Sequence, residues 1–391
     1  MKILYFSSHP YLNLAAPSGP GTHMREVIKA FENRGHQVVK FIAGGEKMDA
    51  SAPIVFKKNP IKKYIPAYFW QSLKDRQLLK FDESLFVQLN KFIQTEKPDL
   101  IYERGYYLMS SGVRAARENN LRHFIELNAP YPEEKTAMEG KSWFMSKADN
   151  IEKFQVENAS LVVTVSSALK DYFLRRTKVT SDKILVTPNA VDAQVFHHAG
   201  GDVSAMRSRH GFEQHHLVIG FVGSIFPYHG VDELINAFVE IAKSRDHARL
   251  LVVGDGEILP QLKHALNSTG LAHKAVFTGN VPHKDVFDLI CCMDITVMAR
   301  SNWYGSPVKI FEYGAMKKLI IAPDEIPIHD VMEHGVNGFI LGKNERALLP
   351  TLRHAIDHPE ECQILANAFY SKVKNQHTWQ HVGDSILEYC T

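Results

Sequence analysis

The stretch LVIGFVGSIFPYHGVD, residues 217–232, decides the fold that we predict for this chain. Its first six residues are almost all apolar and include three β-branched side chains, as in a strand buried on both faces. A loop with Gly223 and Gly230 follows, and a helical pattern runs from about residue 232 to 242. A buried strand that passes through a glycine loop into a helix is the repeating unit of a parallel α/β sheet.

The same alternation extends along the chain in both directions. We predict a helix over residues 22–33, and strands over residues 2–6, 37–43, 100–102, 123–127, 161–165, 249–253, 275–278, 295–299, 319–322 and 338–341. Strands that alternate with helices of this length predict parallel sheets covered by helices on both faces. We therefore expect an α/β protein with two Rossmann-like halves that face each other across a cleft.

The chain has 391 residues, which is too long for one core if a domain averages about 150 residues. Residues 197–210 have no clear period and are predicted to be a linker. We predict an N-terminal domain over residues 1–190 and a C-terminal domain over residues 191–375. Residues 376–391 are predicted to form a helix that packs back on the N-terminal domain.

Composition excludes several classes of protein. The charges nearly balance at +2, which argues against a dedicated nucleic-acid binder. The four cysteines have neither metal-ligand spacing nor a disulfide pattern, which fits a reducing compartment. No apolar run approaches the roughly 18 residues of a membrane-spanning helix. We expect a cytoplasmic protein that binds no nucleic acid.

The run SPVKIFEYGAM, residues 306–316, combines a helix start with a cation and a carboxylate. Ser306 suits an N-cap, and Pro307 suits the first helical position because its missing N–H is not needed there. The first N–H groups of a helix attract anions, and Lys309 adds a positive charge beside them. Glu312 lies on the same helical face. Taken alone, the run also fits an ordinary capped helix with an exposed Lys/Glu pair.

Three further loops end strands or begin helices where a ligand is expected to bind. Residues 18–23 lead into the first helix, and their glycines allow a phosphate to approach the backbone, although their spacing is not Gly-x-Gly-x-x-Gly. Gly254 and Val281 follow two strands of the second half and are expected at one edge of its sheet. A flat base is able to stack there while backbone groups contact its edge.

The order of these segments resembles the retaining nucleotide-sugar glycosyltransferases of the GT-B fold, family-4 type, also called glycosyl transferases group 1. The resemblance covers essentially the whole chain and is closer to a subgroup with a Ser-Pro-x-Lys-x-x-Glu helix. It implies transfer of a sugar from a nucleoside diphosphate sugar to an acceptor hydroxyl with retained anomeric configuration. It also implies that neither a metal nor a separate cofactor is needed.

The resemblance assigns roles to residues of this chain. Lys309 is expected to stabilise charge on the leaving diphosphate, and Glu312 to hold the ribose hydroxyls. The residues expected to bind the donor are Gly21, Gly223, Ser224, His229, Gly254, Val281, Ser306, Pro307 and Val308.

Three positions depart from the family pattern. Ser224 and His229 stand where such enzymes usually carry an Arg and a Lys that grip the diphosphate, and Tyr304 replaces the first of two glutamates. Two alternatives therefore stay open: a non-catalytic scaffold that binds nucleotide sugars, and a nucleotide-sugar epimerase of the same fold.

In the first half, Glu126 and Asn128 share one side of a predicted strand end, and both are expected to contact the donor sugar or the acceptor. Many relatives carry a histidine near the position of Asn128. Polar residues that only tie down a loop would show the same pattern.

Residues 57–81 hint at the acceptor, because seven lysines and arginines and one acid are interleaved there with aromatic residues. This composition suits contact with anionic lipid, and it also suits a solvated surface loop. Membrane contact would place the protein peripherally on the inner face of the membrane. The acceptor would then be a lipid-linked sugar or a growing glycan, in surface polysaccharide or glycolipid synthesis.

Overall fold

The structure is a computed structural model that describes residues 1–16, 18–46, 66–342 and 347–390. It divides into two compact units, Met1–Thr187 with Val382–Thr391 and Pro188–His381.

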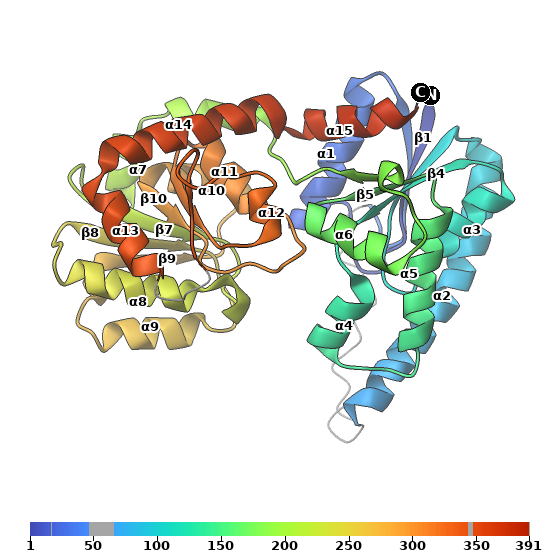
Figure 1. Cartoon of the computed structure of the whole chain (residues 1–391), viewed down its shortest axis with the longest axis horizontal. Helices are drawn as coiled ribbons and strands as arrows, with labels where there is room; N and C mark the ends of the chain where they lie inside the picture. The colour runs from blue at the N-terminus through green and yellow to red at the C-terminus, as the bar shows by residue number, and fades with distance from the viewer. Residues whose placement is uncertain (17, 47–65, 343–346, 391) are drawn as a thin grey trace. The chain divides into compact units, whose positions relative to one another are not determined.

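The N-terminal unit contains, within its described residues, a six-stranded sheet of order β2-β1-β3-β4-β5-β6 in which all neighbours are parallel (Figure 1). Its strands are β1 (Lys2–Ser7), β2 (Gln37–Ile42), β3 (Leu100–Arg104), β4 (Arg122–Leu127), β5 (Leu161–Thr164) and β6 (Ile184–Val186). The central strands are buried throughout or nearly so, because helices cover both faces of the sheet. The predicted strands of this half are confirmed, and β6 is an additional strand that the pattern did not predict.

The helices of this unit are α1 (Gly19–Asn33), α2 (Ala67–Glu96), α3 (Ser111–Glu118), α4 (Tyr131–Glu139), α5 (Met145–Asn158) and α6 (Ser167–Arg176). Helix α15 (Trp379–Leu387) starts in the other unit and ends in this one. Gly383 of α15 lies against Ala30 of α1, because a Cβ on Gly383 would be 2.5 Å from that of Ala30. Asp384 pairs with Arg34.

The C-terminal unit repeats the design with the parallel strand order β12-β11-β10-β7-β8-β9 among its described residues. Its strands are β7 (Leu217–Val222), β8 (Ala248–Val253), β9 (Ala275–Gly279), β10 (Ile295–Val297), β11 (Leu319–Ala322) and β12 (Phe339–Ile340). Its helices are α7 (Val203–Arg209), α8 (Val231–Ala242), α9 (Leu259–Asn267), α10 (His283–Cys292), α11 (Val308–Ala315), α12 (Ile326–His329), α13 (Leu348–Asp357) and α14 (Pro359–Gln376). The prediction of two Rossmann-like α/β halves is confirmed.

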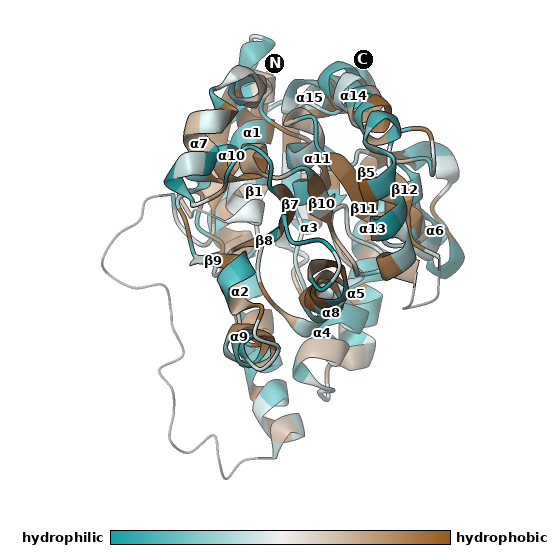
Figure 2. Ribbon diagram, turned by 90° about the vertical axis from the view of Figure 1, so that its left-hand side faces the viewer, coloured by the Kyte–Doolittle hydropathy of each residue, from teal (hydrophilic) through white to brown (hydrophobic). Residues whose placement is uncertain are grey.

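Alternation along β7 separates the core of this unit into two clusters. Val218 and Val222 pack with residues of α10 and α11, whereas Ile219 and Phe221 pack with residues of α8 and α13. Figure 2 shows the apolar character of β7 and β10. Since successive side chains of a strand point to opposite faces, helices on both sides are needed to bury such a strand.

The predicted linker over residues 197–210 is wrong. These residues form a 3₁₀ segment, η3 (Ala193–Gly200), and helix α7. Arg207 of α7 is buried and donates two hydrogen bonds of 2.7 Å to Asp294 and one of 3.1 Å to the carbonyl oxygen of Cys292. A partner 87 residues away holds the helix in place, so local periodicity did not reveal it.

We expect Gly254→Ala to destabilise the protein by about 3 kcal/mol, because a Cβ there would lie 2.1 Å from the carbonyl oxygen of Gly223 and the backbone has φ of +128°. The matched control is Gly270→Ala, where φ is +75° and no atom lies within 4 Å. This change should cost about 1–2 kcal/mol. Urea denaturation of both variants measures the difference, and equal losses would contradict the proposed close contact.

Candidate functional site

Three loops meet at the carboxyl edge of the C-terminal sheet, after β7, β8 and β9. The N–H of Gly223 donates to the carbonyl oxygen of Val253 at 2.9 Å, and the N–H of Gly254 donates to that of Gly279 at 3.0 Å. Gly254 leaves room for the backbone of Gly223 because it has no side chain. The three loops therefore form one continuous backbone surface, at the sheet edge where open α/β sheets bind ligands.

Helix α11 is attached to this edge by Tyr313. The phenol of Tyr313 is fully buried, and its oxygen accepts a hydrogen bond of 2.8 Å from the N–H of Val222, the last residue of β7. This contact fixes the helix against the end of the strand. It brings the first turn of α11 to the glycine that follows, Gly223.

The predicted cap of α11 is wrong by one residue. Pro307 is the N-cap with ψ of 117°, the helix begins at Val308, and no side chain caps it. The hydroxyl of Ser306 instead accepts a hydrogen bond of 3.0 Å from the N–H of Asn189, whose side chain donates to the carbonyl oxygen of Ser306. A contact 117 residues away in the chain decides this local geometry.

Lys309 points its ammonium group at Gly223. A Cβ on Gly223 would lie 2.9 Å from Nζ, and Nζ lies 4.4 Å from the centre of the Phe221 ring. Nζ is buried and makes no hydrogen bond within the described parts of the chain. Burial lowers the pKa of Lys309 to about 7, although the charge of Glu312 opposes this shift. A buried cation without a hydrogen-bond partner is costly unless a ligand satisfies it.

Glu312 follows Lys309 by one helical turn and is also buried. One of its carboxylate oxygens lies 3.1 Å from Nε2 of His283, the first residue of α10. Val281 lies two residues before His283 and is partly buried against the core. The structure thus brings Glu312 close to the loop after β9, where the nucleotide base of the donor is predicted to stack.

Ser224 and His229 lie in the loop after β7, as predicted. Ser224 is exposed, and its carbonyl oxygen lies 2.5 Å from Nδ1 of His229, which therefore carries a proton. Burial, followed by the charge of Lys309, lowers the pKa of His229 to about 4. At neutral pH the imidazole is uncharged and leaves Lys309 as the cation beside Gly223.

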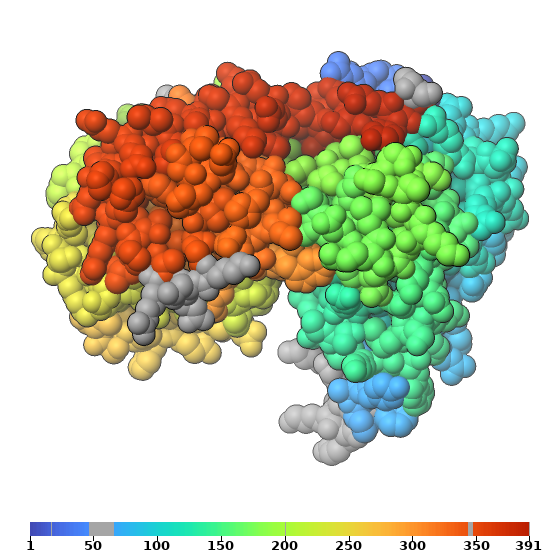
Figure 3. All heavy atoms as spheres, viewed as in Figure 1, coloured from blue at the N-terminus to red at the C-terminus, as the bar shows by residue number. Residues whose placement is uncertain are grey.

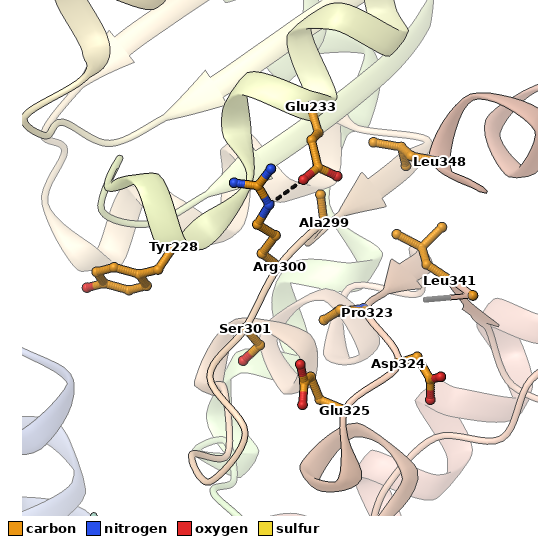
Figure 4. Close-up of a pocket in the computed structure, with 11 residues that line it drawn as sticks. Tyr228, Glu233, Ala299, Arg300, Ser301, Pro323, Asp324, Glu325, Leu341 and Leu348 are labelled. Atoms are coloured by element: carbon orange, nitrogen blue, oxygen red, sulfur yellow. Dashed lines mark ion pairs between the residues drawn. The ribbon is translucent and has the colours of Figure 1, made fainter. Parts of the chain in front are cut away.

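A cavity of about 510 Å³ lies elsewhere on the C-terminal unit (Figure 4). Arg300 projects toward it from the segment after β10 and pairs with Glu233 of α8. Its other lining residues include Tyr228, Asp324 and Glu325. None of the predicted donor-binding residues lines this cavity. Its lining residue Tyr228 directly precedes His229, and their ring centres lie 4.4 Å apart.

A buried carboxylate organises the corresponding edge of the N-terminal unit. Glu126, at 1% exposure, accepts hydrogen bonds from His23 at 2.9 Å, from Tyr102 at 2.6 Å, from Asn128 at 2.5 Å and from Arg104. Burial alone would raise the pKa of Glu126, but the charges of His23 and Arg104 and the hydrogen bonds outweigh it and lower the pKa. The carboxylate is thus ionised and fully engaged by protein donors.

Asn128 and Gly21 have more specific positions than the sequence indicated. The side-chain oxygen of Asn128 is buried and makes no hydrogen bond within the described residues, while its nitrogen donates to Glu126. Gly21 lies inside the first turn of α1, where its N–H donates to the hydroxyl of Ser18 at 3.3 Å. A Cβ on Gly21 would lie 2.4 Å from the carbonyl oxygen of Ala16. Close packing against Ala16 therefore requires glycine there, whatever its role toward a phosphate.

Sequence reasoning missed His9, which follows β1 at the same edge. Its ring centre lies 3.8 Å from that of Tyr106, and burial together with the charge of Arg104 lowers the pKa of His9 to about 4. The sequence did contain a signal for His9, because His9 follows the first strand as Asn128 follows β4, and polar residues at such strand ends were predicted to form the site. A lone histidine after a strand is a weak signal without the fold.

Two groups of described residues bring three possible metal ligands within 4.8 Å of one another. The groups are Glu213, His215 and His216, and His354, His358 and Glu361. Neither group includes a residue predicted for the site. Within the same described ranges, every helix is too short or too polar to cross a bilayer.

Two successive segments of the chain match known protein families. Residues 17–195 match the family model Glycosyltransferase Family 4, and residues 216–358 match the model Glycosyl transferases group 1. The chain carries a family 4 glycosyltransferase domain followed by a group 1 glycosyltransferase domain. The loops around Gly223, together with Lys309 and Glu312, lie in the group 1 domain, whereas Glu126 and Asn128 lie in the family 4 domain.

Curated relatives extend the comparison. The phosphatidylinositol N-acetylglucosaminyltransferase GPI3 subunit of Saccharomyces cerevisiae is 24% identical over 238 residues, which are 61% of this chain and 52% of that subunit. The chain thus spans about half the length of this relative. The alpha-monoglucosyldiacylglycerol synthase of Acholeplasma laidlawii is 22% identical over 381 residues, covering 92% of this chain and 89% of that enzyme.

Among solved structures, the HepE protein of Anabaena in complex with UDP has a TM-score of 0.72 at 16% identity and covers 99% of both chains. This likeness shows that the two domains together have the GT-B fold.

We expect Glu126→Gln to destabilise the family 4 domain by about 3–5 kcal/mol at neutral pH, because it leaves the buried guanidinium of Arg104 without its counter-charge. The lowered pKa means that the carboxylate stabilises the fold above its usual pKa of 4.5 and less as pH falls below it. The gap between wild type and variant in urea denaturation should therefore narrow in acid. Glu139→Gln, which removes more exposed ion pairs with Lys74 and Lys135, should cost about 1 kcal/mol or less. Equal losses for the two variants would contradict the central role of Glu126.

Proposed function

We propose that this protein transfers a sugar from a nucleoside diphosphate sugar to an acceptor hydroxyl and retains the anomeric configuration. One observation carries the proposal: the buried ammonium of Lys309 points at Gly223 and makes no hydrogen bond within the described residues. A diphosphate would supply the missing acceptors. Proteins with this fold include HepE, which binds UDP.

The chemical task in such a transfer is to stabilise negative charge on the departing diphosphate. Burial lowers the pKa of Lys309 to about 7, and a bound diphosphate would favour its protonated form, whose charge is worth more at this buried position than in bulk solvent. The N–H groups of the first turn of α11, from Val308 onward, have no side-chain cap. They lie at the positive end of the helix dipole, which attracts anions. This arrangement supports stabilisation of the leaving group without a metal ion.

Glu312 and Val281 fit the nucleoside half of the donor. A buried carboxylate accepts hydrogen bonds from ribose hydroxyls, and the loop of Val281 offers a partly apolar surface to a base. His229 is uncharged because its pKa is low, and its single N–H, at Nδ1, already donates to the carbonyl oxygen of Ser224, so in this state it neither neutralises a phosphate nor donates to one. Gly254 allows the backbone of Gly223 to form the floor beneath these groups.

In the family 4 domain we assign Asn128 to substrate contact and Glu126 to positioning. The oxygen of Asn128 has an unused acceptor position among the described residues, whereas both oxygens of Glu126 are occupied. Glu126 holds the amide of Asn128 and the ring of His23 in fixed orientations. No general base is needed in this scheme, because the departing phosphate takes the acceptor proton.

The acceptor class rests on relatives. Two relatives are a phosphatidylinositol N-acetylglucosaminyltransferase subunit and an alpha-monoglucosyldiacylglycerol synthase, and both are named for membrane lipids. We propose a lipid-linked or glycan acceptor in glycolipid or surface polysaccharide synthesis, with the protein peripheral on the cytoplasmic face of the membrane.

A second candidate is a nucleotide-sugar-binding scaffold without turnover. It is favoured by Ser224, His229 and Tyr304, because usual diphosphate and sugar ligands of the family are absent at these positions.

A turnover measurement separates the candidates. Incubation with a labelled donor and acceptor lipid, followed by proton NMR of the product, should show an anomeric configuration equal to that of the donor. Release of nucleotide with inversion would contradict retention, and donor conversion without an acceptor would favour the epimerase.

We expect one member of a panel of UDP-, GDP-, ADP- and dTDP-sugars to raise the melting temperature of the wild type, and Lys309→Met to abolish this response. A ligand at 100 times its Kd stabilises the native state by about 2.7 kcal/mol. The matched control is Lys318→Met, since Lys318 is another largely buried lysine of this unit whose Nζ already donates to the carbonyl oxygen of Cys291 at 2.8 Å. The melting temperature of Lys318→Met should still rise with the same nucleotide sugar. Loss of the response in both variants would contradict a specific role for Lys309.

We expect Lys309→Met to stabilise the protein without ligand by about 1–3 kcal/mol near neutral pH, because it removes a buried cation without a hydrogen-bond partner. The pKa of about 7 in the folded protein lies below the usual 10.5, so between these values the unfolded chain binds a proton that the folded chain does not. The free energy of unfolding of the wild type therefore rises as pH increases from about 7 to 10.5. Urea denaturation should show the variant's advantage to be largest below pH about 7 and absent above pH about 10.5. A constant difference across this range would contradict the burial of the charge.

A further inference from the structure

A cluster of exposed apolar side chains lies at the start of α2 and includes none of the residues assigned to the transfer. Tyr68, Phe69 and Leu73 of α2 are 42%, 48% and 47% exposed, and Trp143 in the connection between α4 and α5 is 58% exposed. We call these four residues the aromatic tip. Figure 3 shows the start of α2, in blue, beside the α4 region, in teal, on one surface.

The three rings of the aromatic tip contact one another. Ring centres lie 5.0 Å apart for Phe69 and Trp143, 5.8 Å for Tyr68 and Trp143, and 6.3 Å for Tyr68 and Phe69, all edge to face. The patch is therefore continuous and joins two segments that are about 70 residues apart in sequence. Single exposed apolar residues are ordinary on a protein surface, but a packed cluster of aromatic rings marks an interaction site.

Buried polar contacts hold the aromatic tip in place. Asp75 is fully buried and accepts hydrogen bonds from the hydroxyl of Ser142 at 2.5 Å and from that of Tyr107 at 3.0 Å. The N–H of Trp143 donates to the hydroxyl of Ser72 at 3.0 Å. The chain thus buries a carboxylate and three hydroxyls next to side chains that it leaves in water. Polar groups are usually exposed and large apolar groups buried, so the reverse arrangement here indicates that the exposed rings bind a partner.

The surroundings of the aromatic tip are cationic. Lys141 and Lys147 flank Trp143 in sequence and are exposed. On α2, Arg76 and Lys80 are exposed, at three and seven residues after Leu73, which places them on its face of the helix. Glu139, the last residue of α4, is already paired with Lys74 and Lys135. Exposed cations thus accompany the aromatic rings on both segments that form the tip.

We propose that the aromatic tip docks the protein on an anionic lipid surface. Trp and Tyr favour the interface between water and acyl chains, because their rings are apolar at one end and polar at the other. Each Lys or Arg near an anionic leaflet adds about 1 kcal/mol of attraction. The predicted lipid contact of residues 57–81 included the first part of α2 but not Trp143, and its residues 57–65 lie outside the described residues. Docking rests on the peripheral membrane location proposed above and names the surface that makes the contact, and its test needs neither donor nor acceptor, so it fails separately from the transfer.

Co-sedimentation of the full chain with vesicles tests docking without any donor or acceptor. We expect binding to vesicles of equal phosphatidylglycerol and phosphatidylcholine, weaker binding in high salt, and little binding to phosphatidylcholine alone. Phe69→Ser with Trp143→Ser should weaken binding by about tenfold or more, because two buried rings are lost from the lipid interface. The matched control is Tyr228→Ser with Ile364→Ser, whose side chains are 48% and 68% exposed on the other unit. This control should bind like the wild type.

A second pair of variants tests the charges. Lys141→Glu with Lys147→Glu should weaken binding to anionic vesicles, whereas Lys91→Glu with Lys178→Glu, which changes the same charge at exposed sites of the same unit, should have a much smaller effect. All the substituted side chains are exposed, so the melting temperatures should stay near that of the wild type, and this verifies folding. Three results would overturn docking: no vesicle binding by the wild type, equal binding by the tip variant and the wild type, or self-association that the tip variant abolishes. The last would assign the aromatic tip to a protein interface.

Discussion

The C-terminal unit depends on one close approach between two backbones, in which the carbonyl oxygen of Gly223 occupies the space that a side chain at residue 254 would fill. This approach keeps the loops after β7 and β8 together at the edge of the sheet. Tyr313 then ties α11 to the last residue of β7, and the ammonium of Lys309 reaches Gly223 as a result. A larger residue at position 223 or 254 would separate the elements that make the site.

Glu126 and Lys309, two buried charged residues predicted for the site, differ in whether the protein satisfies them with hydrogen bonds. Glu126 receives hydrogen bonds from His23, Tyr102, Arg104 and Asn128, so its charge stabilises the fold and orients its neighbours. Lys309 is buried without any hydrogen bond among the described residues, so its charge destabilises the unliganded fold. A satisfied network indicates a structural anchor, and an unsatisfied charge indicates a place for a ligand of opposite charge.

Several predictions from local pattern were wrong for a common physical reason. Ser306 was expected to cap α11, but it binds Asn189, and residues 197–210 were expected to be a linker, but Arg207 anchors them to Asp294. In each case a polar side chain found a partner about 90 or more residues away. Local signals describe what a segment prefers in isolation, and long-range hydrogen bonds outweigh that preference when they are buried.

The sequence by itself determined the α/β alternation, the two halves and the family resemblance, because strand and helix patterns and glycine loops are local features of the chain. It also placed Lys309 and Glu312 on one helical face. Only the tertiary structure decided which buried charges have hydrogen-bond partners, so that Glu126 has four and Lys309 has none among the described residues. It also decided that Trp143 joins Phe69 in the aromatic tip. These outcomes depend on contacts between distant segments, and a pattern of neighbouring residues does not contain them.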